Sequence, residues 1–126
     1  MGQIRNITAH FTRERRYFEN DLGREFDFTP STGPYEYLLG ALSGCFYLTL
    51  LSIKHESRWG DVEIKVTGEK RDEEPTTLKK TVLDITVKDA GDKEEFLHLV
   101  DEAAKLCSIY STISHVSEME VKVTFI

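Results

Sequence analysis

The chain is 126 residues long, with 40% hydrophobic and 30% charged residues, and its formal net charge at pH 7 is −6. This composition excludes a disordered chain, and the length predicts one folded, soluble domain spanning residues 1–126. Since no face rich in lysine or arginine offsets the negative charge, nucleic acids and anionic membranes are not expected partners.

Residues 1–16 are polar and lack the apolar segment of a secretory signal peptide, so we expect a cytoplasmic protein. Thiols are kept reduced in that compartment, which favours two free cysteines, Cys45 and Cys107, over a structural disulfide. No histidine stands at metal-ligand spacing from either cysteine, and we therefore expect no metal site.

The first third of the chain predicts three short β-strands. Its apolar and aromatic residues form three runs: Ile4, Ile7 and Phe11; Tyr17 and Phe18; Phe26 and Phe28. Residues 20–23, Asn-Asp-Leu-Gly, predict a turn before Arg24, and Pro30, Gly33 and Pro34 end the strands.

A helix is expected from about Pro34 to Ser57, ending before Gly60. Proline suits the first helical position, and Glu36 lies in the first turn, where the helix dipole favours a carboxylate. The run over 37–53 is apolar on nearly every side, but it is shorter than the ~20 residues of a membrane span and contains serine and threonine. We therefore predict a buried helix of a soluble protein, covered all round.

The second half of the chain predicts two strands, a helix and a last strand. Apolar and polar residues alternate in the three strands, at 62–67, 82–87 and 118–125. A hairpin loop is expected at 70–77, and Asp92 with Glu95 forms the capping-box pattern of a helix start. The apolar stripe of that helix is Phe96, Val100, Ala103, Cys107 and Tyr110. The order is βββ-α-ββ-α-β, an α+β domain with strands wrapped around two buried helices.

Each cysteine is thus placed on a predicted buried helix. Cysteine is among the most buried residue types, so two inert core thiols are one interpretation. The other is a redox pair, in which one thiol attacks an oxidant and the second closes a disulfide. The residues by themselves leave both interpretations open.

Three segments carry a resemblance to a known family. Residues 33–45, Gly-Pro-Tyr-Glu-Tyr-Leu-Leu-Gly-Ala-Leu-Ser-Gly-Cys, hold a proline, a glutamate, an aliphatic run, small residues and then the cysteine. Residues 66–71 and 106–108 are similar to the charged strand end and the second-cysteine segment of the same family. From about residue 24 to residue 126, the chain resembles the OsmC/Ohr family of thiol peroxidases.

The resemblance implies an OsmC-like fold in an intertwined homodimer, with antiparallel sheets wrapped around two buried helices and active sites at the subunit interface. It also implies reduction of organic hydroperoxides in defence against oxidative stress. Cys45 would attack the peroxide and become a sulfenic acid, and Cys107 would condense with it to a disulfide. An external dithiol would then restore the enzyme, and no metal, flavin or nucleotide cofactor is needed.

A charged partner is expected for Cys45, because its helix neighbours are apolar or small and such surroundings raise the pKa of a thiol. In the family, an arginine from the N-terminal strands has this role. We choose Arg24, which opens the strand leading into the helix. Arg13, Arg15 and Arg16 remain open as alternatives.

Glu36 is the residue expected to orient this arginine. Nine positions along a continuous helix give a rise of ~13.5 Å and about half a turn, so Glu36 does not easily reach Cys45 of its own chain. Either the helix is broken near Gly40 or, as we favour, Glu36 serves the other subunit. The alternative role for Glu36 is to stabilise the helix dipole. In the best-characterised peroxidase branch the glutamate lies one position earlier, at Tyr35 here, so the spacing is more similar to the OsmC-like branch.

Two other functions stay open at this point. A non-catalytic dimer that binds a small apolar ligand between its subunits would have thiols that are slow to alkylate and that form no disulfide with peroxide. A thiol redox sensor that acts through a partner protein would be oxidised without turnover.

Overall fold

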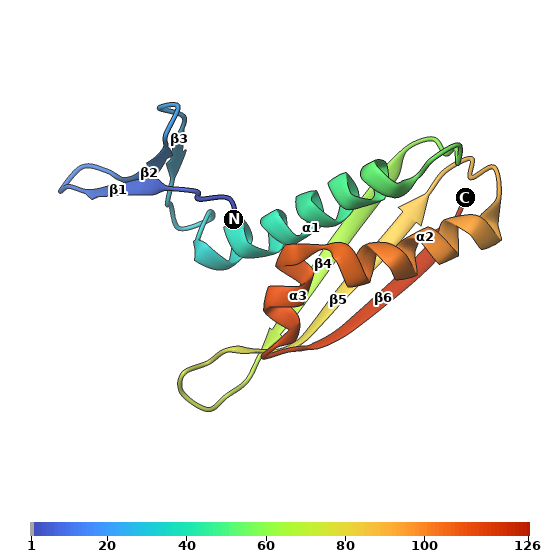
Figure 1. The fold of residues 1–126 in the computed structure, drawn as a ribbon. Helices are drawn as coiled ribbons and strands as arrows, with labels where there is room; N and C mark the ends of the chain where they lie inside the picture. Colours follow the sequence, from blue (N-terminus) through green and yellow to red (C-terminus); the bar gives the residue numbers. More distant parts are fainter. Residues whose placement is uncertain (1) are drawn as a thin grey trace. The chain divides into compact units, whose positions relative to one another are not determined.

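The computed structural model describes residues 2–126, which form two compact units, one ending at Tyr37 and the other comprising Leu38–Ile126 (Figure 1). The elements follow the order βββ-α-ββ-αα-β, so the predicted α+β class is confirmed. A single domain across residues 1–126 stays a prediction.

The N-terminal unit is an antiparallel sheet of three strands. These are β1 (Ile7–Phe11), β2 (Arg16–Asn20) and β3 (Glu25–Asp27), in the order β1-β2-β3. The predicted turn joins β2 to β3, where the Asn20 side-chain oxygen accepts hydrogen bonds from the backbone N–H groups of Leu22 and Arg24. Gly23 in this turn has φ +81°, a conformation that glycine adopts without strain.

Aromatic side chains hold this small unit together. The rings of Phe18 and Phe26 stack across β2 and β3 with centroids 5.0 Å apart. The ring of Tyr37 meets Phe18 edge-on at 5.4 Å, and its hydroxyl donates a hydrogen bond to the carbonyl of Asp27. The aromatic runs in the sequence therefore mark one packed face of the sheet.

Helix α1 (Pro34–Ile53) begins at the predicted proline. The Glu36 carboxylate accepts a 2.7 Å hydrogen bond from the backbone N–H of Gly33, the reciprocal half of a capping box. The helix ends at Ile53 rather than near Ser57, because His55 takes the left-handed conformation, with φ 50°, and stops the helical hydrogen bonds.

The sheet of the C-terminal unit has three strands, β4 (Val62–Lys70), β5 (Leu78–Val87) and β6 (Glu118–Phe125), in the order β4-β5-β6. Strands β4 and β5 form the predicted antiparallel hairpin. Strands β5 and β6 are parallel, so the expectation of purely antiparallel sheets is wrong for this pair. The physical reason is that helices occupy the connection between them, and such a crossover returns the chain to the end where β5 began.

The second predicted helix is in fact two helices, α2 (Lys93–Leu106) and α3 (Ser108–Ser114). The expected helix start is confirmed, since the Asp92 side chain accepts a hydrogen bond from the backbone N–H of Glu95. Cys107 lies between the two helices with φ −70° and ψ 113°, an extended conformation. It is fully buried, as the apolar stripe predicts, but it interrupts the helix rather than forming part of it.

The core of the C-terminal unit lies between its helices and its sheet (Figure 1). Its fully or almost fully buried side chains include Leu42, Phe46 and Leu50 of α1, Leu83, Ile85 and Val87 of β5, and Phe96 and Ala103 of α2. Gly68 of β4 allows α1 to approach the sheet: a Cβ there would lie 2.8 Å from Leu78 Cδ2 and 3.2 Å from Leu39 Cδ2. The position of β4 that lacks a side chain, Gly68, therefore faces Leu39 in the N-terminal half of α1.

Within residues 2–126, α1 is the one helix long and apolar enough to cross a membrane. Length and composition are weak evidence of a span, because core helices of soluble proteins meet the same measure. Three side chains of α1 are fully buried within the C-terminal unit, as in a core helix. The absence of a membrane partner stays a prediction.

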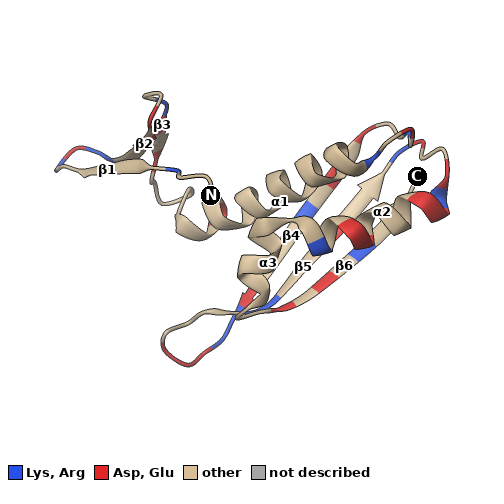
Figure 2. Cartoon of the chain, viewed as in Figure 1, with Lys and Arg blue, Asp and Glu red and all other residues tan. Residues whose placement is uncertain are grey.

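The rest of α1 is uncovered within one chain, so the expectation that it is covered all round is not met by a single copy. Leu48 is 66% exposed and Leu51 is 41% exposed. In Figure 2, α1 has almost no charged residues, whereas β4, β5, β6 and α2 have several. The exposed side of α1 is thus apolar, a character typical of surfaces that bind another protein.

Candidate thiol site

The two cysteines meet in the C-terminal unit. The sulfur atoms of Cys45 on α1 and Cys107 between α2 and α3 are 3.1 Å apart, and both thiols are free. A disulfide bond measures about 2.05 Å, so the two sulfurs would have to approach by roughly 1 Å to form one. Cys45 is half-buried and Cys107 is buried, which leaves Cys45 as the more accessible thiol.

The break between α2 and α3 fixes the Cys107 side chain. The backbone N–H of Cys107 donates a 2.8 Å hydrogen bond to the Ala103 carbonyl and closes α2. The Cys107 sulfur accepts a hydrogen bond of 3.4 Å from the backbone N–H of Tyr110 in the first turn of α3. The ring of Tyr110 in turn packs against Phe46, next to Cys45, with centroids 6.0 Å apart. These contacts hold the two thiols side by side.

Opposing influences act on the Cys45 thiol. Partial burial raises its pKa, but hydrogen bonds from the backbone N–H of Ile109, from the Cys107 thiol and from Ser108 outweigh burial. The pKa of Cys45 therefore lies below its ordinary value. These donors are neutral, whereas the sequence led us to expect a cation in this position.

The Cys107 thiol is shifted in the opposite direction. Burial is the largest influence and raises its pKa, the backbone N–H of Tyr110 lowers it, and the neighbouring Cys45 raises it, which together give a pKa of about 11. Because the thiolate is the nucleophilic form of cysteine, this difference makes Cys45 the stronger nucleophile of the two near neutral pH.

Alkylation at pH 8 is expected to distinguish the two thiols. With a pKa of about 11, Cys107 would be roughly one-thousandth thiolate at that pH, so iodoacetamide should label Cys45 far faster. Trypsin cuts after Lys54 and Lys105, which places the cysteines in separate peptides for quantification by mass spectrometry. In guanidinium chloride the two rates should converge, and equal rates in the folded protein would contradict the assignment.

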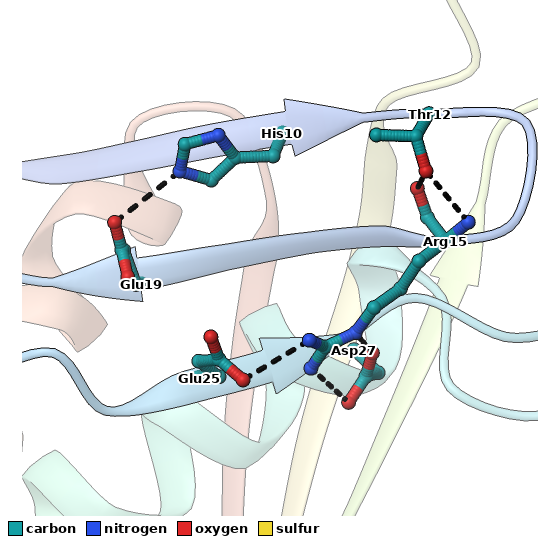
Figure 3. Close-up of polar contacts among 6 residues, drawn as sticks. All are labelled: His10, Thr12, Arg15, Glu19, Glu25 and Asp27. Carbon is teal, nitrogen blue, oxygen red and sulfur yellow. Dashed lines mark hydrogen bonds and ion pairs between the residues drawn. The ribbon is translucent and has the colours of Figure 1, made fainter.

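The four candidate arginines all belong to the N-terminal unit, and Arg15 is held there by carboxylates. Its guanidinium donates hydrogen bonds of 2.7 and 3.1 Å to Asp27, pairs with Glu25 at 3.0 Å and covers the Tyr17 ring at 3.9 Å (Figure 3). The bidentate bond to Asp27, and then the bond to Glu25, raise the pKa of Arg15 above its ordinary value. Arg15 is therefore a structural cation of this hairpin.

Arg24, our choice from the sequence, is exposed in the turn between β2 and β3. Its backbone N–H is bonded to Asn20, and no side chain among residues 2–126 pairs with its guanidinium. Arg13 and Arg16 are also exposed. Arg24 thus has a charge that is not neutralised by its own hairpin, and its role toward Cys45 stays a prediction.

Glu36 lies in the first turn of α1, bonded to Gly33. Helix α1 continues through Gly40, so the alternative that the helix breaks there is wrong. The observed contact is the helix-stabilising one, and a role across a dimer stays a prediction.

Ser108 and the backbone of Ile109 are the parts of this site that sequence reasoning did not find. Ser108 belongs to the segment 106–108 that carries the family resemblance, but the resemblance gives it no role. Neither group carries a specific signal in the sequence, because the spacing of the apolar residues predicts one continuous helix there and does not show that a new helix begins at Ser108. Among residues 2–126, no three His, Cys, Asp or Glu side chains gather as a metal site.

The comparison with protein families gives one match: a family described as OsmC-like protein covers residues 28–122. No curated protein matches the chain.

Several solved structures share the fold. An OsmC-like protein from Mycoplasma pneumoniae is 19% identical, with 100% of this chain and 99% of that chain covered and a TM-score of 0.86. An OsmC-like protein of unknown function from Vibrio cholerae is 17% identical over 98% and 100% of the two chains, with a TM-score of 0.82. An organic hydroperoxide resistance protein of Bacillus subtilis is 21% identical over 97% and 98%, with a TM-score of 0.72.

Proposed function

Because the chain belongs to the OsmC-like protein family, we propose that it is a thiol-dependent peroxidase that reduces organic hydroperoxides through a disulfide cycle of Cys45 and Cys107. Organic hydroperoxide resistance proteins among its structural neighbours support a role in peroxide stress. The observation that carries the proposal is the 3.1 Å contact between two free thiols whose pKa values are shifted in opposite directions.

The first step uses the accessible thiol. The Cys45 thiolate attacks the terminal oxygen of the hydroperoxide, the O–O bond breaks, and the alkoxide leaves and takes a proton to become an alcohol. Cys45 is thereby oxidised to a sulfenic acid. Because Cys45 is only half-buried on α1, its sulfur is the more accessible of the two to a peroxide.

The second step uses the buried thiol. Cys107 attacks the sulfenic sulfur of Cys45, an S–S bond forms, and the sulfenic oxygen leaves as water. A pKa of about 11 suits this role, because a protonated Cys107 does not compete for the peroxide. An external dithiol then reduces the disulfide by exchange, so one hydroperoxide and one dithiol become an alcohol, water and a disulfide.

The proposal includes a homodimer in the cytoplasm. The apolar exposed side of α1, with Leu48 and Leu51, supports burial against a second copy. In such a dimer Arg24 would supply a cation near Cys45, and Glu36 of one subunit would orient the arginine at the site of the other. No cofactor is required by this chemistry.

Oxidation by one equivalent of cumene hydroperoxide tests the proposal. The expected product is a peptide pair joined by a Cys45–Cys107 disulfide, with loss of both free thiols, and dithiothreitol should restore them. Hydrogen peroxide at the same concentration serves as the comparison and should react more slowly. If both thiols persist, the peroxidase proposal fails and the two cysteines are packed core thiols of a ligand-binding dimer.

A further inference from the structure

We propose that Ser108 is a positioning residue whose hydroxyl, beside the Cys45 sulfur, holds the attacking thiol in its ionised form and aligned with Cys107. The inference rests on the proposed function for the naming of Cys45 as the attacking thiol. It assigns to a neutral side chain a part of the role that the sequence suggested for an arginine.

The geometry places Ser108 at the sulfur. Its Oγ lies 3.9 Å from Cys45 Sγ, within hydrogen-bond range for a sulfur atom. Among residues 2–126 this is the one hydrogen-bond contact of the Ser108 hydroxyl, and the side chain is exposed. Because the exposed Ser108 side chain makes this one polar contact, and makes it to the reactive thiol, we assign its role to that contact.

Three successive residues converge on Cys45. The Cys107 thiol lies 3.1 Å from the sulfur, the Ser108 hydroxyl follows, and the backbone N–H of Ile109 also donates to it. The extended conformation of Cys107 separates α2 from α3 at this point, where Cys107 and Ser108 both contact the Cys45 sulfur. Together these groups lower the pKa of Cys45 despite the cost of its partial burial.

Ser108 differs from the other two donors in what it can do during the cycle. The Cys107 thiol ceases to be a donor when it attacks the sulfenic sulfur, and a backbone N–H can only donate. A hydroxyl donates to a thiolate and can rotate to accept from the O–H of a sulfenic acid. Ser108 is therefore suited to hold Cys45 both before and after its oxidation.

The titration of Cys45 can be measured without interference from its neighbours. The other titratable groups of this segment are Cys107, with a pKa of about 11, and Tyr110, whose pKa is raised first by burial and then by Cys107. Below about pH 9 both stay protonated, so a change in the alkylation rate of Cys45 reports its own ionisation.

The test is the pH profile of iodoacetamide labelling of Cys45, read from its tryptic peptide, in the parent and three variants. Ser108→Ala is expected to raise the apparent pKa of Cys45 by about half a unit to one unit and to slow its labelling at pH 7 by about three- to tenfold. Ser108→Thr keeps a hydroxyl and should restore the parent profile. Ser111→Ala, the same change at an exposed serine on α3, is the matched control and should leave the profile unchanged.

A Ser108→Ala profile equal to that of the parent would overturn the inference, and so would an equal shift in Ser111→Ala. Ser108→Gly also removes the hydroxyl and gives a second reading if the alanine variant does not fold. Labelling needs no peroxide, so the inference and the proposed function fail separately. If the parent does not turn over peroxide but the pKa of Cys45 shifts in Ser108→Ala, the inference holds and the proposed function fails. If the parent is active but the labelling profile is the same in Ser108→Ala, the inference fails and the proposed function holds.

Discussion

Cys45→Ser is expected to reduce the turnover of cumene hydroperoxide with dithiothreitol to the uncatalysed rate, a loss of at least about a thousandfold. The hydroxyl of serine is not ionised near neutral pH, so the variant lacks the nucleophile that attacks the O–O bond. The neutral donors around Cys45 lower the pKa of a thiol and do not make an alcohol reactive. Consumption of the peroxide, followed in the presence of excess dithiol, is the measurement.

Cys107→Ser is the matched control, since it removes the other thiol by the same change. It should still react once with the peroxide and accumulate a sulfenic acid on Cys45, which a dimedone probe detects. The parent should prefer cumene hydroperoxide to hydrogen peroxide. A Cys45→Ser variant that keeps the parental rate would show that the thiols are structural and would favour the ligand-binding alternative.

Phe46→Ala is expected to destabilise the protein by about 3–5 kcal/mol. Phe46 is fully buried next to Cys45, and its ring packs against Tyr110, so the substitution leaves a cavity where α1 meets α3. Small domains unfold with free energies of about 5–15 kcal/mol, and the change would remove a large part of that stability. Urea unfolding followed by circular dichroism measures the free energy of unfolding.

Leu48→Ala is the control on the same helix. Leu48 is 66% exposed within one chain, and its truncation should cost about 0.5 kcal/mol or less in the separated chain. Equal losses for the two variants at a protein concentration that keeps the chains apart would contradict the assignment of the core. A loss in Leu48→Ala that grows with protein concentration would instead indicate that this side of α1 is buried in an assembly.

Features with a local chemical cause could be predicted from the sequence. Pro34 marks the start of α1 because a proline needs no hydrogen-bond partner there, and Asp92 with Glu95 marks the start of α2 by capping. The alternation of apolar residues gave the strands and their buried faces. Each of these signals lies within a few residues of the feature that it predicts.

Features that depend on distant contacts could not be predicted in this way. Alternation fixes which face of β6 is buried but not the direction of the neighbouring strand, so its parallel pairing with β5 was missed. The helical spacing of Ala103, Cys107 and Tyr110 in the sequence gives no sign of the break between α2 and α3, because the spacing of apolar residues does not record the backbone conformation of a single residue.

The candidate site was predicted only in part, because it too depends on contacts between residues that are distant in the sequence. The pairing of Cys45 with Cys107 came from the family resemblance, and the sulfur contact now gives it a geometry. The neutral donors at Cys45 were not foreseen, since a backbone N–H leaves no mark in a sequence and a single serine is common. Arginine was chosen because charge is visible in a sequence and hydrogen-bond direction is not.

The contact between the two sulfurs also links heat resistance to redox state. In the oxidised chain, a disulfide would close residues 45–107 into a covalent ring that contains β4, β5, α2 and most of the C-terminal half of α1. Closing a ring of this length lowers the entropy of the unfolded chain, which stabilises the folded state by about 4 kcal/mol in the chain-entropy description. The oxidised protein would thus be harder to unfold than the reduced protein. The reductant that restores the thiols would also return the chain to its less stable form.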